Sequence, residues 1–201
     1  NEDLFSIAHT FDGGLILAGR SDSNLSGDKT ENSYGQYDYW IVKLNILLDI
    51  EWDKTVGGSL RDNAFQISQT INGEYVVGGS SLSGISGNKT EANEGSDDFW
   101  VVKLDTTGNL LWQKNIGGLS SDGYNCSLKE IPGSQGQFFA GLTSNSNISG
   151  DKTEDSFGSY DFWTIKFREK YNRLQGNVFI DSNSNLVRDS GETFPVGRII
   201  T

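Results

Sequence analysis

The segment DYWIVKL at residues 38–44 decides the fold, because it returns as DFWVVKL at residues 98–104 and as DFWTIKF at residues 161–167. The copies begin 60 and 63 residues apart. Aromatic and β-branched residues occupy both alternating faces of each copy, which is typical of a strand in a sheet covered on both sides. Repetition at this spacing predicts an array of similar structural units.

Two further motifs follow the same spacing. The loop-like sequence SGDKTE at residues 26–31 returns as SGNKTE at residues 86–91 and as SGDKTE at residues 149–154. The segment WDKTVGG at residues 52–58 returns as WQKNIGG at residues 112–118, whereas Gln175 stands where a third tryptophan is expected. We therefore divide residues 1–170 into units of about 1–58, 59–118 and 119–170, and we expect the third unit to lack its last element.

Each complete unit is predicted to contain four strands. In the second unit, residues 64–70 and 74–79 form a hairpin around Asn72-Gly73, and residues 98–104 and 110–114 form the last two strands. Gly108 supplies the positive φ between those two strands, and the first unit has Leu48 at this position. Four strands are typical of a β-propeller blade, although about 60 residues exceed the roughly 40 to 50 of the common blade types, with the excess in the polar loop. The predicted fold is all-β, a β-propeller-like array of four-stranded blades, and further blades of the same polypeptide are expected because an isolated sheet leaves a face uncovered.

Composition excludes several classes of protein. The 201 residues include 25 Gly, 2 Pro and 23 aromatic residues (5 Trp, 7 Tyr and 11 Phe), which favours strands joined by glycine turns over a helical bundle. A net charge of −11 opposes binding to nucleic acid or to an anionic lipid surface. No segment approaches the roughly 20 apolar residues of a membrane helix, so we expect no membrane insertion. Because residue 1 already stands inside a repeat, we expect the sequence to be an internal fragment.

The repeats resemble a family of secreted repeat proteins of Bacteroidota. The resemblance rests on the three SGDKTE-like loops, on the three tryptophan-containing strands and on DGGLILAG at residues 12–19. It implies a β-propeller-like protein that is extracellular or on the outer cell surface, commonly a cargo of the type IX secretion pathway. It implies no catalytic residues.

Residues 171–201 carry a second resemblance. The segments GNVFIDSNSN at residues 176–185 and DSGE at residues 189–192 resemble the opening of calcium-binding B-type repeats of bacterial adhesins, which are small β-sandwich modules. Residues 181–192 also have the spacing of a twelve-residue calcium loop, with Leu186 replacing the usual glycine. The expected calcium ligands are Asp181, Asn183, Asn185, the carbonyl of Val187, Asp189 and Glu192. The alternative is an Asp- and Asn-rich turn held by its own hydrogen bonds.

The repeated loops place polar residues on what we expect to be one rim of the molecule. These possible contacts with cations or ligand hydroxyls are Asp28, Glu31, Asp38, Asn88, Glu91, Asp98, Asp151, Glu154 and Asp161. The alternative is structural: the acids bond to loop backbone, and Lys29, Lys89 and Lys152 pair with neighbouring acids. Because the three strand tryptophans lie in apolar segments, we expect them to pack between units rather than to bind sugars.

Enzymatic activity is not expected. The single histidine, His9, aligns with Gln69 and Lys129 and is predicted to be an exposed, variable position. Adjacent acids such as Asp97 and Asp98 belong to a repeated loop, whereas catalysis requires one differentiated site. We expect a non-catalytic scaffold for adhesion to, or binding of, surface glycans or proteins. The alternative is an accessory region of a secreted carbohydrate-active enzyme whose catalytic domain lies outside this sequence.

Overall fold

The computed structural model describes residues 1–134 and 136–169, and these residues form eleven strands and no helix. The all-β prediction is confirmed. In this part of the chain there is accordingly no helix that could cross a membrane. The predicted calcium loop and the predicted B-type module lie outside the described residues.

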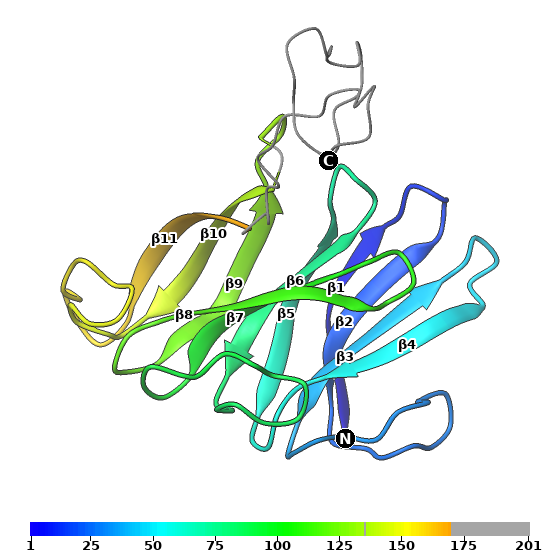
Figure 1. Cartoon of the computed structure of the whole chain (residues 1–201), viewed down its shortest axis with the longest axis horizontal. Helices are drawn as coiled ribbons and strands as arrows, with labels where there is room; N and C mark the ends of the chain where they lie inside the picture. Colours follow the sequence, from blue (N-terminus) through cyan, green and yellow to red (C-terminus); the bar gives the residue numbers. More distant parts are fainter. Residues whose placement is uncertain (135, 170–201) are drawn as a thin grey trace, which may run out of the picture. The chain divides into compact units, whose positions relative to one another are not determined.

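The strands form three antiparallel sheets in chain order, which Figure 1 shows one after another along the molecule. Sheet 1 has the order β1-β2-β3-β4, sheet 2 the order β5-β6-β7-β8, and sheet 3 the order β9-β10-β11. The bounds are β1 Glu2–His9, β2 Leu15–Ser21, β3 Asp38–Leu44, β4 Ile50–Val56, β5 Asp62–Gln69, β6 Tyr75–Ser81, β7 Asp98–Leu104, β8 Leu110–Ile116, β9 Asp122–Glu130, β10 Gln137–Ser144 and β11 Asp161–Arg168. Four strands in each of the first two sheets agree with the repeat. The described residues do not close a ring.

The predicted turns are present. Between β5 and β6 the amide of Gly73 donates to the carbonyl of Thr70, and Gly73 has a φ of +89°. Between β7 and β8, Gly108 has a φ of +84° as expected. Leu48 adopts the same left-handed conformation in the first unit, with a φ of +67°. The loop geometry is therefore kept even where its glycine is missing.

Consecutive sheets pack face to face, so that sheet 2 is buried on both sides. On one face, the indole of Trp100 lies 4.9 Å from the ring of Tyr39 in sheet 1, and the Tyr39 hydroxyl donates to the Trp100 carbonyl. On the other face, Phe99 joins a core cluster with Leu128 and Phe138 of sheet 3. All seven residues of β7 are buried, which confirms the two-sided apolar pattern and the packing role predicted for Trp100. Each large side chain buried in this way stabilises the fold by about 2 kcal/mol.

The outer faces of sheets 1 and 3 repeat the apolar positions of sheet 2 but have no neighbour among the described residues. Phe162 is 78% exposed, whereas Phe99, its equivalent in sheet 2, is completely buried. Ile7 is 55% exposed, whereas its equivalent Ile67 is completely buried. The outer faces of sheets 1 and 3 therefore carry the same apolar positions as the faces that pack together inside the stack.

Candidate functional site

The aspartates that begin the third strands do not lie on a rim. Asp38 and Asp98 are completely buried, and Asp161 is half-buried. The Asp38 carboxylate accepts a 2.6 Å hydrogen bond from the amide of Tyr34, and Asp98 accepts one of 2.7 Å from the amide of Glu94. Burial raises the pKa of both Asp38 and Asp98 to about 6. These carboxyl groups therefore hold the preceding loop in place.

The third residue of each SGDKTE-like loop connects consecutive units. Asn88 of the second unit accepts a 2.8 Å hydrogen bond from the amide of Gly57, at the end of sheet 1. Asp151 accepts a 3.4 Å bond from the amide of Gly117, at the end of sheet 2. Asp28 is exposed and has no such contact within the described residues. The recurrence of this position thus has a structural explanation.

The loop glutamates differ between units. Glu31 accepts a hydrogen bond from the amide of Thr55 and forms a 2.8 Å ion pair with Lys54. Glu91 and Glu154 are exposed. In the part of the chain that the structure describes, no three His, Cys, Asp or Glu side chains come together to hold a metal ion.

The loop lysines have partners that the sequence did not predict. Lys89 is 1% exposed, and its amine donates to Ser81, Asn93 and Asn115 at 2.6, 2.6 and 3.2 Å. The amine lies 5.2 Å from the centre of the Trp100 ring. Burial lowers the pKa of Lys89 to about 8. The lysine is thus a core residue that cross-links the loop to its own sheet.

The other two units repeat this arrangement. The buried amine of Lys29 donates to the carbonyl of Glu31 and to the hydroxyl of Thr55. The amine of Lys152 donates to Ser144 and Ser156, each at 2.9 Å. None of the three lysines forms an ion pair with an acid among the described residues, so the expectation of local acid partners was wrong. A buried amine satisfied by neutral oxygen atoms explains why the loop sequence repeats so closely.

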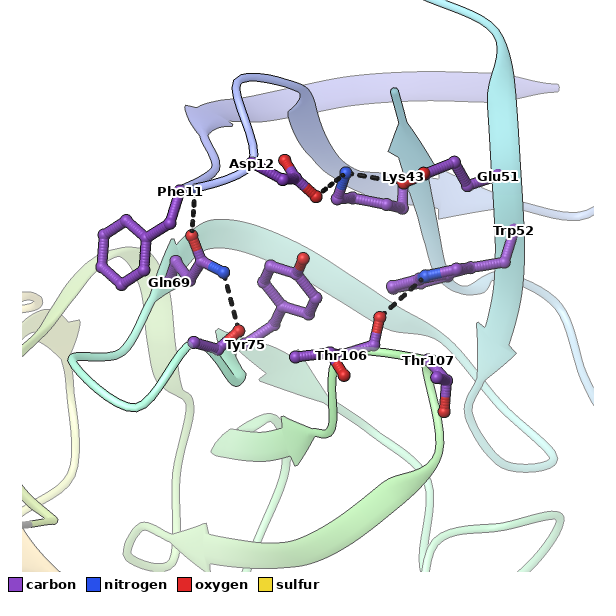
Figure 2. Close-up of a pocket in the computed structure, with 10 residues that line it drawn as sticks. Phe11, Asp12, Lys43, Glu51, Trp52, Gln69, Tyr75, Thr106 and Thr107 are labelled. Carbon is purple, nitrogen blue, oxygen red and sulfur yellow. Dashed lines mark hydrogen bonds and ion pairs between the residues drawn. The ribbon is translucent and has the colours of Figure 1, made fainter. Parts of the chain in front are cut away.

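A groove between sheets 1 and 2 is the best candidate for binding, and Figure 2 shows it in close-up. It has a volume of about 460 Å³ and lies beside the β1–β2, β5–β6 and β7–β8 turns. Its lining residues are Phe11, Asp12, Lys43, Glu51, Trp52, Gln69, Gly73, Tyr75, Thr106 and Thr107. Sequence reasoning did not identify this groove.

A buried lysine between two carboxylates forms one end of the groove (Figure 2). The Lys43 amine lies 2.9 Å from Asp12 and 2.7 Å from Glu51. The hydrogen bond that the Thr10 hydroxyl donates to Asp12 is the main cause that lowers the pKa of Asp12. The hydrogen bond from the Lys43 amine is the next largest cause. Burial lowers the pKa of Lys43, but its bonds to Glu51 and Asp12 outweigh this and raise the pKa overall. With both acids and the amine charged, this end carries one net negative charge.

Aromatic rings form a second part of the groove wall. The ring centres of Trp52 and Tyr75 are 5.8 Å apart, and the Trp52 indole N–H donates to the carbonyl of Thr106 at 3.1 Å. The amide of Phe11 donates to the side chain of Gln69 at 2.7 Å, which joins the turn of sheet 1 to β5. Because Tyr75 is buried, the accessible apolar surface next to the carboxylates comes from the half-buried Trp52 and the exposed Phe11.

The lysine and the aromatic pair recur between sheets 2 and 3, whereas Asn72 and Leu111 replace Asp12 and Glu51. Lys103, the equivalent of Lys43, pairs with Glu74 at 2.5 Å. Trp112, the equivalent of Trp52, lies 5.9 Å from Phe138, the equivalent of Tyr75. The recurrence of Trp52 at Trp112 and of Lys43 at Lys103 was the sequence signal that could have identified this region.

The position of His9 also needs a correction. His9 is exposed as predicted, but its equivalent in sheet 3 is Glu130 rather than Lys129, because Gln69 pairs with Tyr75 and Glu130 with Phe138. The Glu130 side chain accepts a hydrogen bond from the amide of Ile71, in the β5–β6 turn of sheet 2. In the same way, the Gln69 side chain accepts one from the amide of Phe11, in the β1–β2 turn of sheet 1. In the second and third units this position therefore links neighbouring sheets.

No protein-family model matches the chain, and no curated protein sequence matches it. We therefore infer function from the repeat, the sheet packing and the groove.

Proposed function

We propose that this chain is part of a non-catalytic, β-propeller-like scaffold, secreted or held at the outer cell surface, that binds glycans or proteins. The groove beside Trp52, with equivalent parts at the next sheet interface, is the observation that carries the proposal. Binding at several such sheet interfaces would suit adhesion, because several weak contacts to a repeating polymer add up to tight attachment.

Stacking of further units supports the propeller-like arrangement. Phe139 and Phe162 on the outer face of sheet 3, and Leu4 and Ile7 on that of sheet 1, are 48 to 78% exposed. Their equivalents in sheet 2 are buried by neighbouring sheets, and apolar surfaces gain stability when a neighbour of the same kind covers them. Closed propellers contain about 4 to 8 such sheets.

The chemistry of the groove favours neutral glycans among the proposed ligands. Aromatic rings pack against the apolar faces of sugar rings, and carboxylates accept hydrogen bonds from sugar hydroxyls. The volume of about 460 Å³ lies within the range of about 300–1,000 Å³ for small-ligand sites. The net negative charge beside Lys43 disfavours acidic sugars. The same features would serve an accessory region of a carbohydrate-active enzyme.

Binding measurements with the whole chain test this function. We would titrate the protein with neutral β-linked and α-linked oligosaccharides by calorimetry, and we expect at least one class to bind. Trp52→Ala should weaken that binding about tenfold, because truncated aromatic contacts commonly cost more than 1 kcal/mol. Trp40→Ala, outside the groove, is the matched control. Equal binding by both variants would place the site elsewhere, and no binding of any glycan or surface-protein preparation would contradict the proposal.

Calcium binding by residues 181–192 is a separate part of the proposal. Its support is the spacing of oxygen-bearing side chains from Asp181 to Glu192. Calcium bound there would stiffen the C-terminal segment, and its removal is one of the tests described in the Discussion.

A further inference from the structure

The fourth strand of sheet 2 supplies hydrogen-bond acceptors to its neighbours. The Gln113 side chain accepts bonds from the Trp100 indole N–H at 3.2 Å and from the amide of Thr90 at 2.9 Å. Two residues later, Asn115 accepts a bond from the Lys89 amine. One strand thus satisfies a tryptophan, a loop amide and a buried lysine together.

The fourth strand of sheet 1 does the same with different residues. Asp53 accepts bonds from the Trp40 indole N–H at 3.0 Å and from the amide of Thr30 at 3.1 Å. The Thr55 hydroxyl accepts a bond from the Lys29 amine. Asp53 and Gln113 share one repeat position, and Thr55 and Asn115 share another. The acceptors therefore follow a pattern, Trp-(Asp/Gln)-Lys-(Thr/Asn), in β4 and β8.

Sheet 3 carries the matching donors, but no strand among the described residues supplies the matching acceptors. Among the described residues β11 pairs with β10 on one side only. In that part of the chain no residue accepts a bond from the indole N–H of Trp163 or the amide of Thr153, and Lys152 has only its two serine partners. The Lys152 amine lies 5.8 Å from the Trp163 ring, as Lys89 lies beside Trp100. The sequence of residues 170–201 contains no tryptophan and no copy of the pattern.

We propose that the edge of β11 that no described strand covers binds an extended strand, supplied from outside residues 1–201, that carries the pattern Trp-(Asp/Gln)-Lys-(Thr/Asn). The strand runs antiparallel to β11 in the register of β7 and β8. In that register Trp100 faces Asn115 and Lys103 faces Trp112. The (Thr/Asn) residue of the guest strand then lies opposite Trp163, and its tryptophan lies opposite Lys166. Backbone hydrogen bonds to β11 give the affinity. The Trp163 indole N–H, the Thr153 amide and the Lys152 amine select a guest strand that carries the acceptor side chains.

A peptide with the sequence of residues 108–118 tests this edge on the complete 201-residue chain. We would label it, measure binding by fluorescence anisotropy, and follow the Trp163 indole N–H by NMR. We expect saturable binding and a shift of that one indole signal, assigned through Trp163→Phe. A control peptide with Gln113→Leu and Asn115→Val keeps the strand-forming character but loses both acceptors. It should bind about thirtyfold more weakly, since each of the two lost acceptor side chains commonly contributes about 1 kcal/mol.

The outcomes distinguish sequence-specific strand addition from non-specific peptide binding. Trp163→Phe keeps an aromatic side chain but removes the N–H donor, so it should weaken binding of the native peptide and reduce the difference in affinity between the native and the control peptide. Equal binding of the two peptides to the unmodified chain would overturn the proposal without reliance on any protein variant. Absence of peptide binding, or an unchanged Trp163 indole signal, would overturn it as well. None of these results depends on a glycan ligand.

Discussion

Leu48 and Gly108 occupy equivalent positions in the loops before β4 and β8, and both have a left-handed backbone, with φ of +67° and +84°. This conformation costs an L-residue with a Cβ atom about 1–2 kcal/mol, whereas glycine adopts it freely. Leu48 is 62% exposed, so its side chain gains little from burial. The repeat geometry therefore holds Leu48 in an unfavourable conformation.

Replacing this leucine should stabilise the protein. Leu48→Gly is expected to raise the free energy of unfolding by about 0.5–1 kcal/mol, after allowance for the greater freedom of glycine in the unfolded chain. Urea denaturation measures the difference. Gly108→Ala is the matched control and should destabilise, because its Cβ would lie 3.0 Å from atoms of Trp52 and Lys54. A less stable Leu48→Gly variant would contradict this expectation. It would show that the Leu48 side chain stabilises the fold by more than its left-handed backbone conformation destabilises it.

Stability should increase as the pH falls from 7 to about 5. Burial, together with the nearby negative charges of Asp62 and Asp122, raises the pKa of Asp38 and of Asp98 to about 6, above the usual 3.8. One oxygen atom of each carboxylate is buried without a hydrogen-bond partner. The folded state therefore binds more protons than the unfolded state between about pH 4 and pH 6, and protonation stabilises it. Between pH 7 and pH 5 the gain in the free energy of unfolding is on the order of 1 kcal/mol for each group.

The control for this pH dependence is Asp38→Asn. Asparagine keeps an acceptor for the amide of Tyr34 but carries no charge, so the variant should show a smaller increase than the unmodified chain, with Asp98 and Asp62, whose pKa values burial also raises, still contributing. Denaturant titrations at pH 7, 6 and 5 provide the comparison. A flat profile, or a loss of stability over this range, would contradict the raised pKa values. Below about pH 4 we expect stability to fall, because the pKa of Asp12 and that of Asp105 are lowered in the fold.

Equivalent phenylalanines should contribute very differently to stability. Phe99→Ala removes a completely buried ring and should cost about 3–5 kcal/mol. Phe162→Ala removes a ring that is 78% exposed and should change the free energy of unfolding by less than about 0.5 kcal/mol. Urea denaturation at low protein concentration measures both. Similar losses in the two variants would mean that the outer face of sheet 3 is covered in solution.

Calcium removal tests the C-terminal loop. We expect EGTA to lower the melting temperature of the 201-residue chain, and Asp181→Ala to abolish that difference, because ligand binding stabilises only the folded form. Asp28→Ala, a change at an exposed acid outside the loop, should leave the effect of EGTA intact. Identical melting curves with and without EGTA would leave residues 181–192 as an ordinary turn.

The repeat predicted the strands well and the site poorly, for physical reasons. Alternation around Trp100 and the Asn72-Gly73 turn are local signals, and the structure confirms both. The loop lysines are different, because an ammonium group such as that of Lys89 is usually solvated and nothing local shows that Ser81, Asn93 and Asn115 surround it.

The recurrence of Trp52 and Lys43 marks the region of the groove, but its shape is not local information, because Tyr75 and Thr106 reach it only when sheet 2 packs on sheet 1. Asp12 and Glu51 reach Lys43 from a turn and from a different strand, and Tyr75 comes from the next sheet. Sequence spacing sets the order of these residues but not the angle between neighbouring sheets. The aspartates expected on the rim were misplaced for a related reason, since the loop before β3 folds over Asp38 and buries it.

Residue-resolved hydrogen exchange tests most directly the claim that consecutive sheets cover one another. The amides of β7 lie between β6 and β8, and both faces of the strand are buried. We predict that they exchange only through global unfolding, far more slowly than those of β11, which has one strand neighbour among the described residues and one exposed face. Exchange from β7 as fast as from β11 would contradict the stacked arrangement.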